Sequence, residues 1–316
     1  MNSKRKKIIV SVLVIFISLP VAFILTAFAC FSIMDKTNGT IISSGVTRRY
    51  LLYVPKTYDR SGPTPLVISM HGGASWPAVE MHLSRWNDLA DEHGFIVVYP
   101  AGSGAFFGFG GFRPGPQAWH MGPRSLGRDV RFISDLIDKL EAEYNIDPNR
   151  IYADGMSNGG GMAFALSCKL SDRIAAIGAV ASAQAFLPVD ECGDSMPVAT
   201  VAFHGTADPV AHYKGGASPF SPGLFPNIRD WTARVARRNQ CTGDPSDTRI
   251  TASIRRLAYT NCANNADVIL YTVAGGGHTW PGGKPLPEWI LGRTTNEINA
   301  SRVMWAFFMQ HPRGPK

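Results

Sequence analysis

Short apolar runs alternate with amphipathic segments along most of the chain. The apolar runs predict buried strands over 49–54, 66–70, 95–99, 150–154, 176–181, 198–203 and 268–273. Helices are predicted over 86–93, 130–140, 160–170, 228–238 and 296–308. Strands that alternate with helices favour the α/β class, with a mostly parallel central sheet covered by helices on both faces. The sequence contains no internal repeat and no sign of a second globular domain, so we expect a single one over 46–316.

The start of the chain has a different pattern. Four consecutive basic residues, Lys4 to Lys7, precede an apolar stretch over 8–29. A basic start followed by an apolar segment predicts a signal peptide, and about 20 apolar residues also suffice for an N-terminal membrane anchor. Ala27 to Ala29 fits a cleavage site, and Cys30 could carry a lipid. Cleavage, anchoring through residues 8–29 and a lipid on Cys30 all remain open. Each places the domain outside the cytoplasm, secreted or held at the outer face of the membrane, and residues 30–45 then read as a linker.

Composition and charge narrow the class of protein. Hydrophobic residues make up 45% of the chain and charged residues 17%, which suffices for a large core and argues against disorder. The net charge of +7 comes largely from the four basic residues at the start, without which 27 basic residues face 24 acidic ones. We therefore expect no nucleic-acid partner, and the sequence leaves the oligomeric state open.

Four cysteines lie beyond Cys30, with no CxxC pair among them. In an oxidising compartment an even number favours two disulfides. We favour Cys168 with Cys192 and Cys241 with Cys262, because each pair closes a short loop. The sequence does not fix the pairing, and buried free thiols are the alternative.

The most informative motif is Gly155-Met156-Ser157-Asn158-Gly159, between a predicted strand and a predicted helix. A G-x-S-x-G turn at such a junction needs small residues on both sides and lifts the serine clear of the sheet. The context therefore predicts Ser157 as a nucleophile.

A serine nucleophile needs a histidine base that is oriented by a carboxylate, in the chain order Ser, acid, His. His278 follows the strand 268–273 in a glycine-rich segment, whereas His311 lies in the C-terminal tail and is expected to be solvated. Asp208 stands in a loop just after the strand 198–203, at the edge of the sheet where Ser157 and His278 are expected. We therefore predict Ser157, Asp208 and His278 as a catalytic triad. A turn-forming role before Pro209 is the alternative for Asp208.

Further residues complete the predicted site. Backbone N–H groups of Asn158 and Gly73 are the expected donors to an oxyanion. Trp280 and Trp119 are candidates for substrate-binding aromatic side chains, with plain packing as the alternative for both. His71 and His204 are expected to be structural, and without a clustered ligand set we predict no metal and no cofactor.

Together these residues resemble the polyhydroxybutyrate depolymerase-type esterases, which are related to the feruloyl and acetylxylan esterases of carbohydrate esterase family one, within the α/β-hydrolase superfamily. The resemblance runs from Arg48 to Trp305 and depends on four blocks of sequence: 65–67 with 71–73, 155–160, 204–210 and 276–283. The last block, G-G-H-T-W-P-G-G, is the most specific. The resemblance implies an α/β-hydrolase fold and a triad at Ser157, Asp208 and His278.

The predicted function is an exported serine hydrolase that cleaves carboxylic esters through an acyl-enzyme. Hydroxyalkanoate oligomers, feruloyl or acetyl esters of polysaccharides and small acyl esters all fit as substrates. An acyltransferase with the same triad, a peptidase on this fold and a non-catalytic surface-binding protein are the alternatives.

Overall fold

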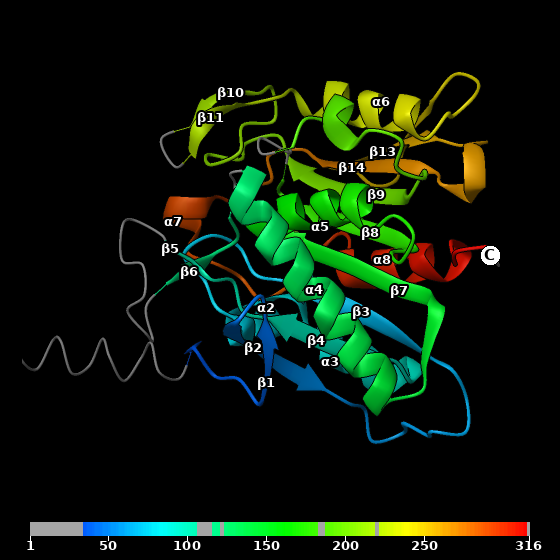
Figure 1. Ribbon diagram of the computed structural model, residues 1–316. Helices are drawn as coiled ribbons and strands as arrows, with labels where there is room; N and C mark the ends of the chain where they lie inside the picture. The colour runs from blue at the N-terminus through cyan, green and yellow to red at the C-terminus, as the bar shows by residue number, and fades with distance from the viewer. Residues whose placement is uncertain (1–33, 106–115, 121–122, 183–186, 219–220, 315–316) are drawn as a thin grey trace, which may run out of the picture.

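The computed structural model describes residues 34–105, 116–120, 123–182, 187–218 and 221–314. Within these ranges ten strands form one sheet, in the order β1-β2-β4-β3-β7-β8-β9-β14-β13-β12 (Figure 1). The strands are β1 Gly39–Ser43, β2 Val46–Tyr53, β3 Thr64–Met70, β4 Ile96–Pro100, β7 Ile146–Met156, β8 Ala176–Val180, β9 Ala199–Gly205, β12 Ser246–Arg249, β13 Ile254–Tyr259 and β14 Val268–Val273.

The six central strands, β4, β3, β7, β8, β9 and β14, run parallel to one another. Antiparallel pairs close the sheet at both edges, with β1 and β2 on one side and β12 and β13 on the other. Parallel strands bring all of their carboxyl ends to one edge, where sites on such sheets are usually built. The predicted α/β class with a mostly parallel sheet is therefore confirmed.

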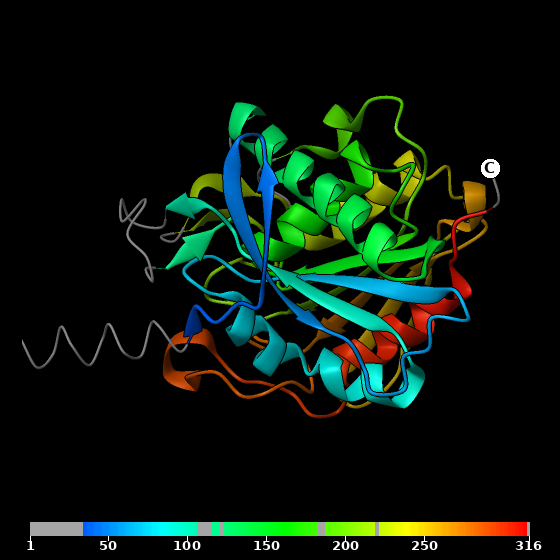
Figure 2. The same ribbon diagram turned by 60° about the horizontal axis from the view of Figure 1, so that its bottom comes forward.

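Helices cover both faces of the sheet (Figures 1 and 2). One face carries α4 Pro123–Glu143, α5 Asn158–Lys169 and α6 Ile228–Arg238, and the other carries α2 Pro77–Ser84, α3 Trp86–His93 and α8 Ala300–Gln310. Successive strand residues point to opposite faces. On β3, Leu66 and Ile68 pack under α4 and α5, and Val67 between them packs with α3 and α8. The apolar runs in the sequence are thus strands buried on both sides.

Two small hairpins and a short helix lie at the carboxyl edge, on the left in Figure 1. These are β5 Gly104–Ala105 with β6 Gln117–Ala118, β10 Gly216–Ser218 with β11 Ser221–Phe225, and α7 Glu288–Leu291. Between β5 and β6, residues 106–115 lie outside the described ranges, as do residues 121–122.

The prediction of a linker over 30–45 is wrong for the residues that the structure describes. Residues 39–43 form β1, which pairs with β2, and Asp35 is buried beside Arg49 with 2.5 Å between a carboxylate oxygen and Nη2. The predicted signal peptide or anchor over 1–29 lies outside the described residues. Within the described ranges, no helix has the length and apolarity needed to cross a membrane. Both favoured disulfides, Cys168–Cys192 and Cys241–Cys262, are confirmed.

Candidate active site

Ser157 stands at the turn between β7 and α5, where the sequence placed it. Its backbone has φ 54° and ψ −118°, a positive φ that a residue with a side chain rarely adopts. Its N–H donates to the carbonyl of Val180 at the end of β8 (2.8 Å), which holds the turn against the neighbouring strand. This strained, half-buried position is typical of a serine that is presented above a sheet edge.

The glycines on either side of Ser157 are required by close backbone contacts. A β-carbon at Gly159 would lie 1.9 Å from the carbonyl oxygen of Met70, and one at Gly155 would lie 2.5 Å from the same atom. Both distances are shorter than real β-carbons show, so the turn fits against the end of β3 only without side chains. The G-x-S-x-G pattern therefore reflects packing of the turn on the neighbouring strand.

His278 and Asp208 form a buried pair. His278 Nδ1 lies 2.9 Å from Asp208 Oδ2, and the two residues are 5% and 4% exposed. The other oxygen of Asp208 accepts the backbone N–H groups of Val210 and Ala211, each at 2.8 Å. The carboxylate is thus fixed by its own loop and can orient the imidazole, with the ring proton on Nδ1 and the lone pair on Nε2.

The charge of Asp208 is stabilised despite its burial. Burial alone would raise the pKa of this carboxyl, but the adjacent His278 and the hydrogen bonds outweigh it and hold the pKa below its ordinary value. His204 Nε2 lies 3.4 Å from Asp208 Oδ2 and donates to the carbonyl of Ala211 (2.7 Å), and burial lowers the pKa of His204. The predicted structural role of His204 is confirmed.

Ser157, Asp208 and His278 follow β7, β9 and β14, which all end at the same edge of the sheet. Strands β7 and β9 are separated only by β8, so their ends lie roughly 10 Å apart. Among the described hydrogen bonds, the Ser157 hydroxyl makes none with His278. Such bonds are often long without substrate and shorten only in the complex.

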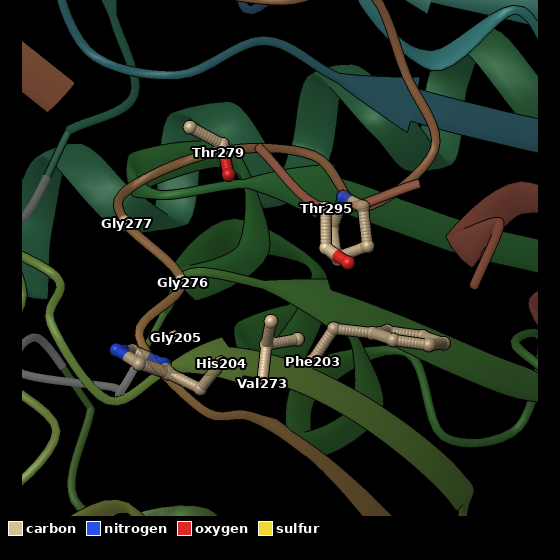
Figure 3. A pocket seen from close by; sticks show the side chains of 9 residues that line it. Phe203, His204, Gly205, Val273, Gly276, Gly277, Thr279 and Thr295 are labelled. Carbon is tan, nitrogen blue, oxygen red and sulfur yellow. The ribbon is translucent and has the colours of Figure 1, made fainter. Parts of the chain in front are cut away.

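A small polar pocket opens between the ends of β9 and β14, beneath the chain that leads to His278 (Figure 3). His204, Gly277 and Thr279 are among its lining residues. Nδ1 of His204 is buried there without a hydrogen-bond partner. Neither His278 nor Asp208 is among its lining residues.

The expected oxyanion donors lie on two adjoining segments. Asn158 begins α5, where the first N–H groups have no carbonyl of their own helix to bind. Gly73 follows β3 in the loop beside the serine, where a β-carbon at Gly72 would come within 3.6 Å of the β-carbon of Ser157. His71 Nε2 accepts the N–H of Gly102 (3.0 Å) and its Nδ1 contacts the Gly72 carbonyl (2.7 Å), which confirms its predicted structural role.

The two candidate tryptophans differ in their surroundings. Trp280 is fully buried and its Nε1 donates to Ser301 (3.0 Å), so the structure favours the packing alternative for this residue. Trp119 is 2% exposed but lies within the site, where its N–H donates to Asn158 Oδ1 (2.6 Å) and its Nε1 to the His71 carbonyl (3.0 Å). The structure therefore ties Trp119 to the loops around Ser157.

One expectation about histidine was wrong. His311 is not solvated: it is 5% exposed, stacks on Phe307 and contacts the carbonyl of the same residue (2.7 Å) at the end of α8. Of the described His, Cys, Asp and Glu side chains, no three or more lie together as a metal ion would require.

Sequence reasoning missed two buried carboxyl groups behind the serine turn. Asp154 on β7 is fully buried, accepts the Ser69 hydroxyl (2.8 Å) and has its pKa raised by burial to about 7. Burial, and secondarily Asp154, raise the pKa of Glu80 on α2 well above its ordinary value. An acidic residue inside the predicted strand 150–154 was the available signal, because a strand buried on both faces has no solvated side for it.

The fold and the edge site define an α/β protein of the esterase type, and comparisons with known proteins agree. The esterase PHB depolymerase family model matches residues 48–218, more than half of the chain, so the chain belongs to this family of esterases. Feruloyl esterase B of Piromyces equi is 32% identical over 251 residues, covering 75% of this chain but only 44% of that protein. The putative esterase NocK of Nocardia uniformis is 29% identical over 86% of this chain and 82% of its own length.

A solved structure supports the fold alone. The acetyl xylan esterase from Aspergillus awamori superposes with a TM-score of 0.55 at 13% identity, over 76% of this chain and 93% of that one. Since the chain spans less than half of the Piromyces protein, that protein's whole activity does not transfer directly.

Proposed function

We propose that this protein is an exported carboxylic ester hydrolase in which Ser157, His278 and Asp208 form the catalytic triad. The observation that carries the proposal is the 2.9 Å contact between His278 and a buried Asp208, at the same sheet edge as the strained turn of Ser157. A serine on such a turn is inert without a base, and a buried carboxylate that binds Nδ1 leaves Nε2 as that base.

The reaction then proceeds in two halves. Ser157 Oγ attacks the ester carbonyl carbon while His278 Nε2 takes its proton, and Asp208 stabilises the resulting imidazolium. The N–H groups of Asn158 and Gly73 bind the oxyanion of the tetrahedral intermediate. The alcohol leaves with the proton from His278. Water then attacks the acyl-enzyme, gives its proton to His278 and releases the acid, and Ser157 regains its proton.

The proposed substrates are esters of the kinds in the names of the relatives: feruloyl esters, acetylated xylan and hydroxyalkanoate oligomers. Small acyl esters belong to the same class. Hydrolysis rates of the purified protein across these esters rank the candidates directly.

Export is proposed from residues 1–29 and agrees with the two disulfides, which form and persist in oxidising compartments. Cleavage before Cys30, retention as an anchor and a lipid on Cys30 give different masses for the mature protein. Mass spectrometry of the protein recovered from cell fractions distinguishes the three. Recovery in the cytoplasm with both cysteine pairs reduced would contradict export.

The triad is tested with Ser157→Ala. Hydrolysis of p-nitrophenyl acetate should fall by on the order of a millionfold in kcat, and labelling by a fluorophosphonate probe should be lost. Ser246→Ala is the matched control, because Ser246 is exposed on the edge strand β12. If Ser157→Ala retains wild-type hydrolysis, the proposed function is wrong.

A further inference from the structure

A second histidine–aspartate pair lies at the same end of the molecule as the candidate active site. His120 Nδ1 is 2.9 Å from Asp129 Oδ2, and the backbone N–H of His120 donates to the same oxygen, also at 2.9 Å. The first of these distances equals that between His278 and Asp208. The ring of His120 is therefore held in one orientation by a fixed carboxylate.

Arg48 stabilises the negative charge of this carboxylate through an ion pair. Asp129 is fully buried on α4, and its Oδ1 accepts Arg48 Nη2 at 2.8 Å, with Arg48 itself 5% exposed. Burial alone would raise the pKa of Asp129, but the His120 hydrogen bond and the Arg48 charge hold it below its ordinary value. Arg48 and His120 thus bind different oxygens of the same carboxylate. In the neutral ring the proton is on Nδ1, and Nε2 carries a lone pair.

The segment that carries His120 contacts both the loop after β3 and Asn158, the residue after Ser157. Gln117 exchanges two backbone hydrogen bonds with Ser75, in the loop after β3, each at 3.2 Å. Trp119 is bound on the other side by the carboxamide of Asn158, which accepts its N–H (2.6 Å) and donates to its carbonyl (3.2 Å). His120 follows directly, so its peptide bond lies against the residue after Ser157.

The imidazole of His120 is 27% exposed, whereas the Asp129 side chain behind it is 0% exposed. Among the described residues, none forms a hydrogen bond with His120 Nε2. The pair therefore presents an oriented acceptor on the segment that Asn158 binds, with its other nitrogen already occupied.

We propose that His120 is a substrate-binding residue whose Nε2 accepts a hydrogen bond from a hydroxyl group carried by the ester substrate. This inference rests on the proposed esterase function and deepens it. An ester group has no donor of its own, so a fixed acceptor at the site selects substrates that carry a hydroxyl elsewhere. The hydroxyl could be a phenol on the acyl group, an aliphatic hydroxyl on the acyl group or a hydroxyl of the sugar alcohol.

Matched ester pairs distinguish these three sources. Methyl ferulate is compared with methyl 3,4-dimethoxycinnamate, methyl 3-hydroxybutyrate with methyl 3-methoxybutyrate, and an acetylated methyl xyloside with its O-methylated form. In each pair a methyl ether replaces the hydroxyl, which removes the donor and adds one methyl group; His120→Phe separates the two effects. In at least one pair the wild type should prefer the hydroxyl member about five- to tenfold in kcat/KM, the usual size of one hydrogen bond. If no pair is discriminated, the inference is overturned without any variant being made.

The variant His120→Phe should bring the ratio in the discriminated pair close to one, and His120→Gln, which retains an acceptor, should keep part of it. Hydrolysis of p-nitrophenyl acetate, which carries no hydroxyl, is measured on the same samples to show that each variant is folded and active. His82→Phe is the matched control, because His82 is exposed on α2. A ratio that survives in His120→Phe overturns the inference. The proposed function fails separately, if Ser157→Ala still hydrolyses p-nitrophenyl acetate.

Discussion

A single methyl group at Gly159 should damage both the fold and the activity, since the turn at Ser157 has no room for it. A β-carbon there would lie 1.9 Å from the Met70 carbonyl oxygen and 2.6 Å from the His71 carbonyl oxygen. Ordinary contact begins at 3.4 Å, so α5 and the end of β3 must separate by about 1.5 Å. Both contacts involve backbone, which cannot yield by a change of rotamer.

The expected cost follows from this displacement. Overpacking of a close contact typically costs about 1–3 kcal/mol, and we expect Gly159→Ala near the upper end of this range. The same displacement shifts Gly73, two residues after His71, relative to Ser157. A misplacement of about 1 Å at a reacting centre costs roughly a hundredfold in rate, so kcat should fall by about that factor in the molecules that fold.

Urea unfolding and p-nitrophenyl acetate kinetics measure the two effects on the same sample. Gly127→Ala is the control, because Gly127 is exposed on α4 and a β-carbon there meets nothing within 4 Å. This change should stabilise the protein by about 1 kcal/mol through helix propensity and leave kcat unchanged. Wild-type stability and turnover in Gly159→Ala would refute the packing account of the G-x-S-x-G turn.

Three further predictions concern charge and cross-links. Asp208→Asn should lower kcat on the order of 10⁴-fold, since the amide favours the wrong tautomer of His278; stopped assays at high enzyme concentration measure it, and a loss under tenfold would contradict the triad. Asp154 has its pKa raised to about 7, so its contribution to stability is complete near pH 4 and lost as pH rises through 7. Asp154→Asn is neutral at every pH, so its free energy of unfolding should rise relative to that of the wild type by roughly 2–3 kcal/mol between pH 5 and pH 8. Urea unfolding measures this difference, and a difference that stays the same across this range would contradict the raised pKa of Asp154. The two disulfides close loops with sequence separations of 24 and 21 residues, so reduction of each should lower the free energy of unfolding by about 3 kcal/mol. Thermal unfolding with and without reductant tests this.

The sequence was sufficient to predict the central strands and the chain order of the candidate triad. The strands are buried on both faces, so their apolar runs stand out, and the edge of a parallel sheet brings together residues that follow different strands. The edge elements were missed for the opposite reason. All four residues of β12 are exposed, and in β1 only the last residue, Ser43, is buried, so neither has an apolar pattern. The sequence therefore predicts a linker over 30–45, where the structure has β1.

Contacts between polar residues that are separated along the chain could not be predicted from the sequence either. His120 and Asp129 are nine positions apart, and nothing in their spacing indicates that they touch. One signal was available. Asp129 lies four residues before Ile133 and seven before Leu136, on the apolar face of the predicted helix, where a carboxylate must be paired to be buried. Such a residue indicates a buried partner, but the partner is identified only by the fold.

The two faces of the sheet contribute differently to the site. On the face covered by α4, Arg48 and Asp129 form a buried ion pair, and Asp129 also holds the ring of His120. On the opposite face, Asp154 on β7 and Glu80 on α2 are buried, and one carboxylate oxygen of each makes no hydrogen bond. Unsatisfied groups of this kind destabilise a core and persist where the surrounding structure fixes them. The strained turn of Ser157 directly follows β7, the strand that carries the buried Asp154, so the apolar packing of β7 against its neighbours must offset both.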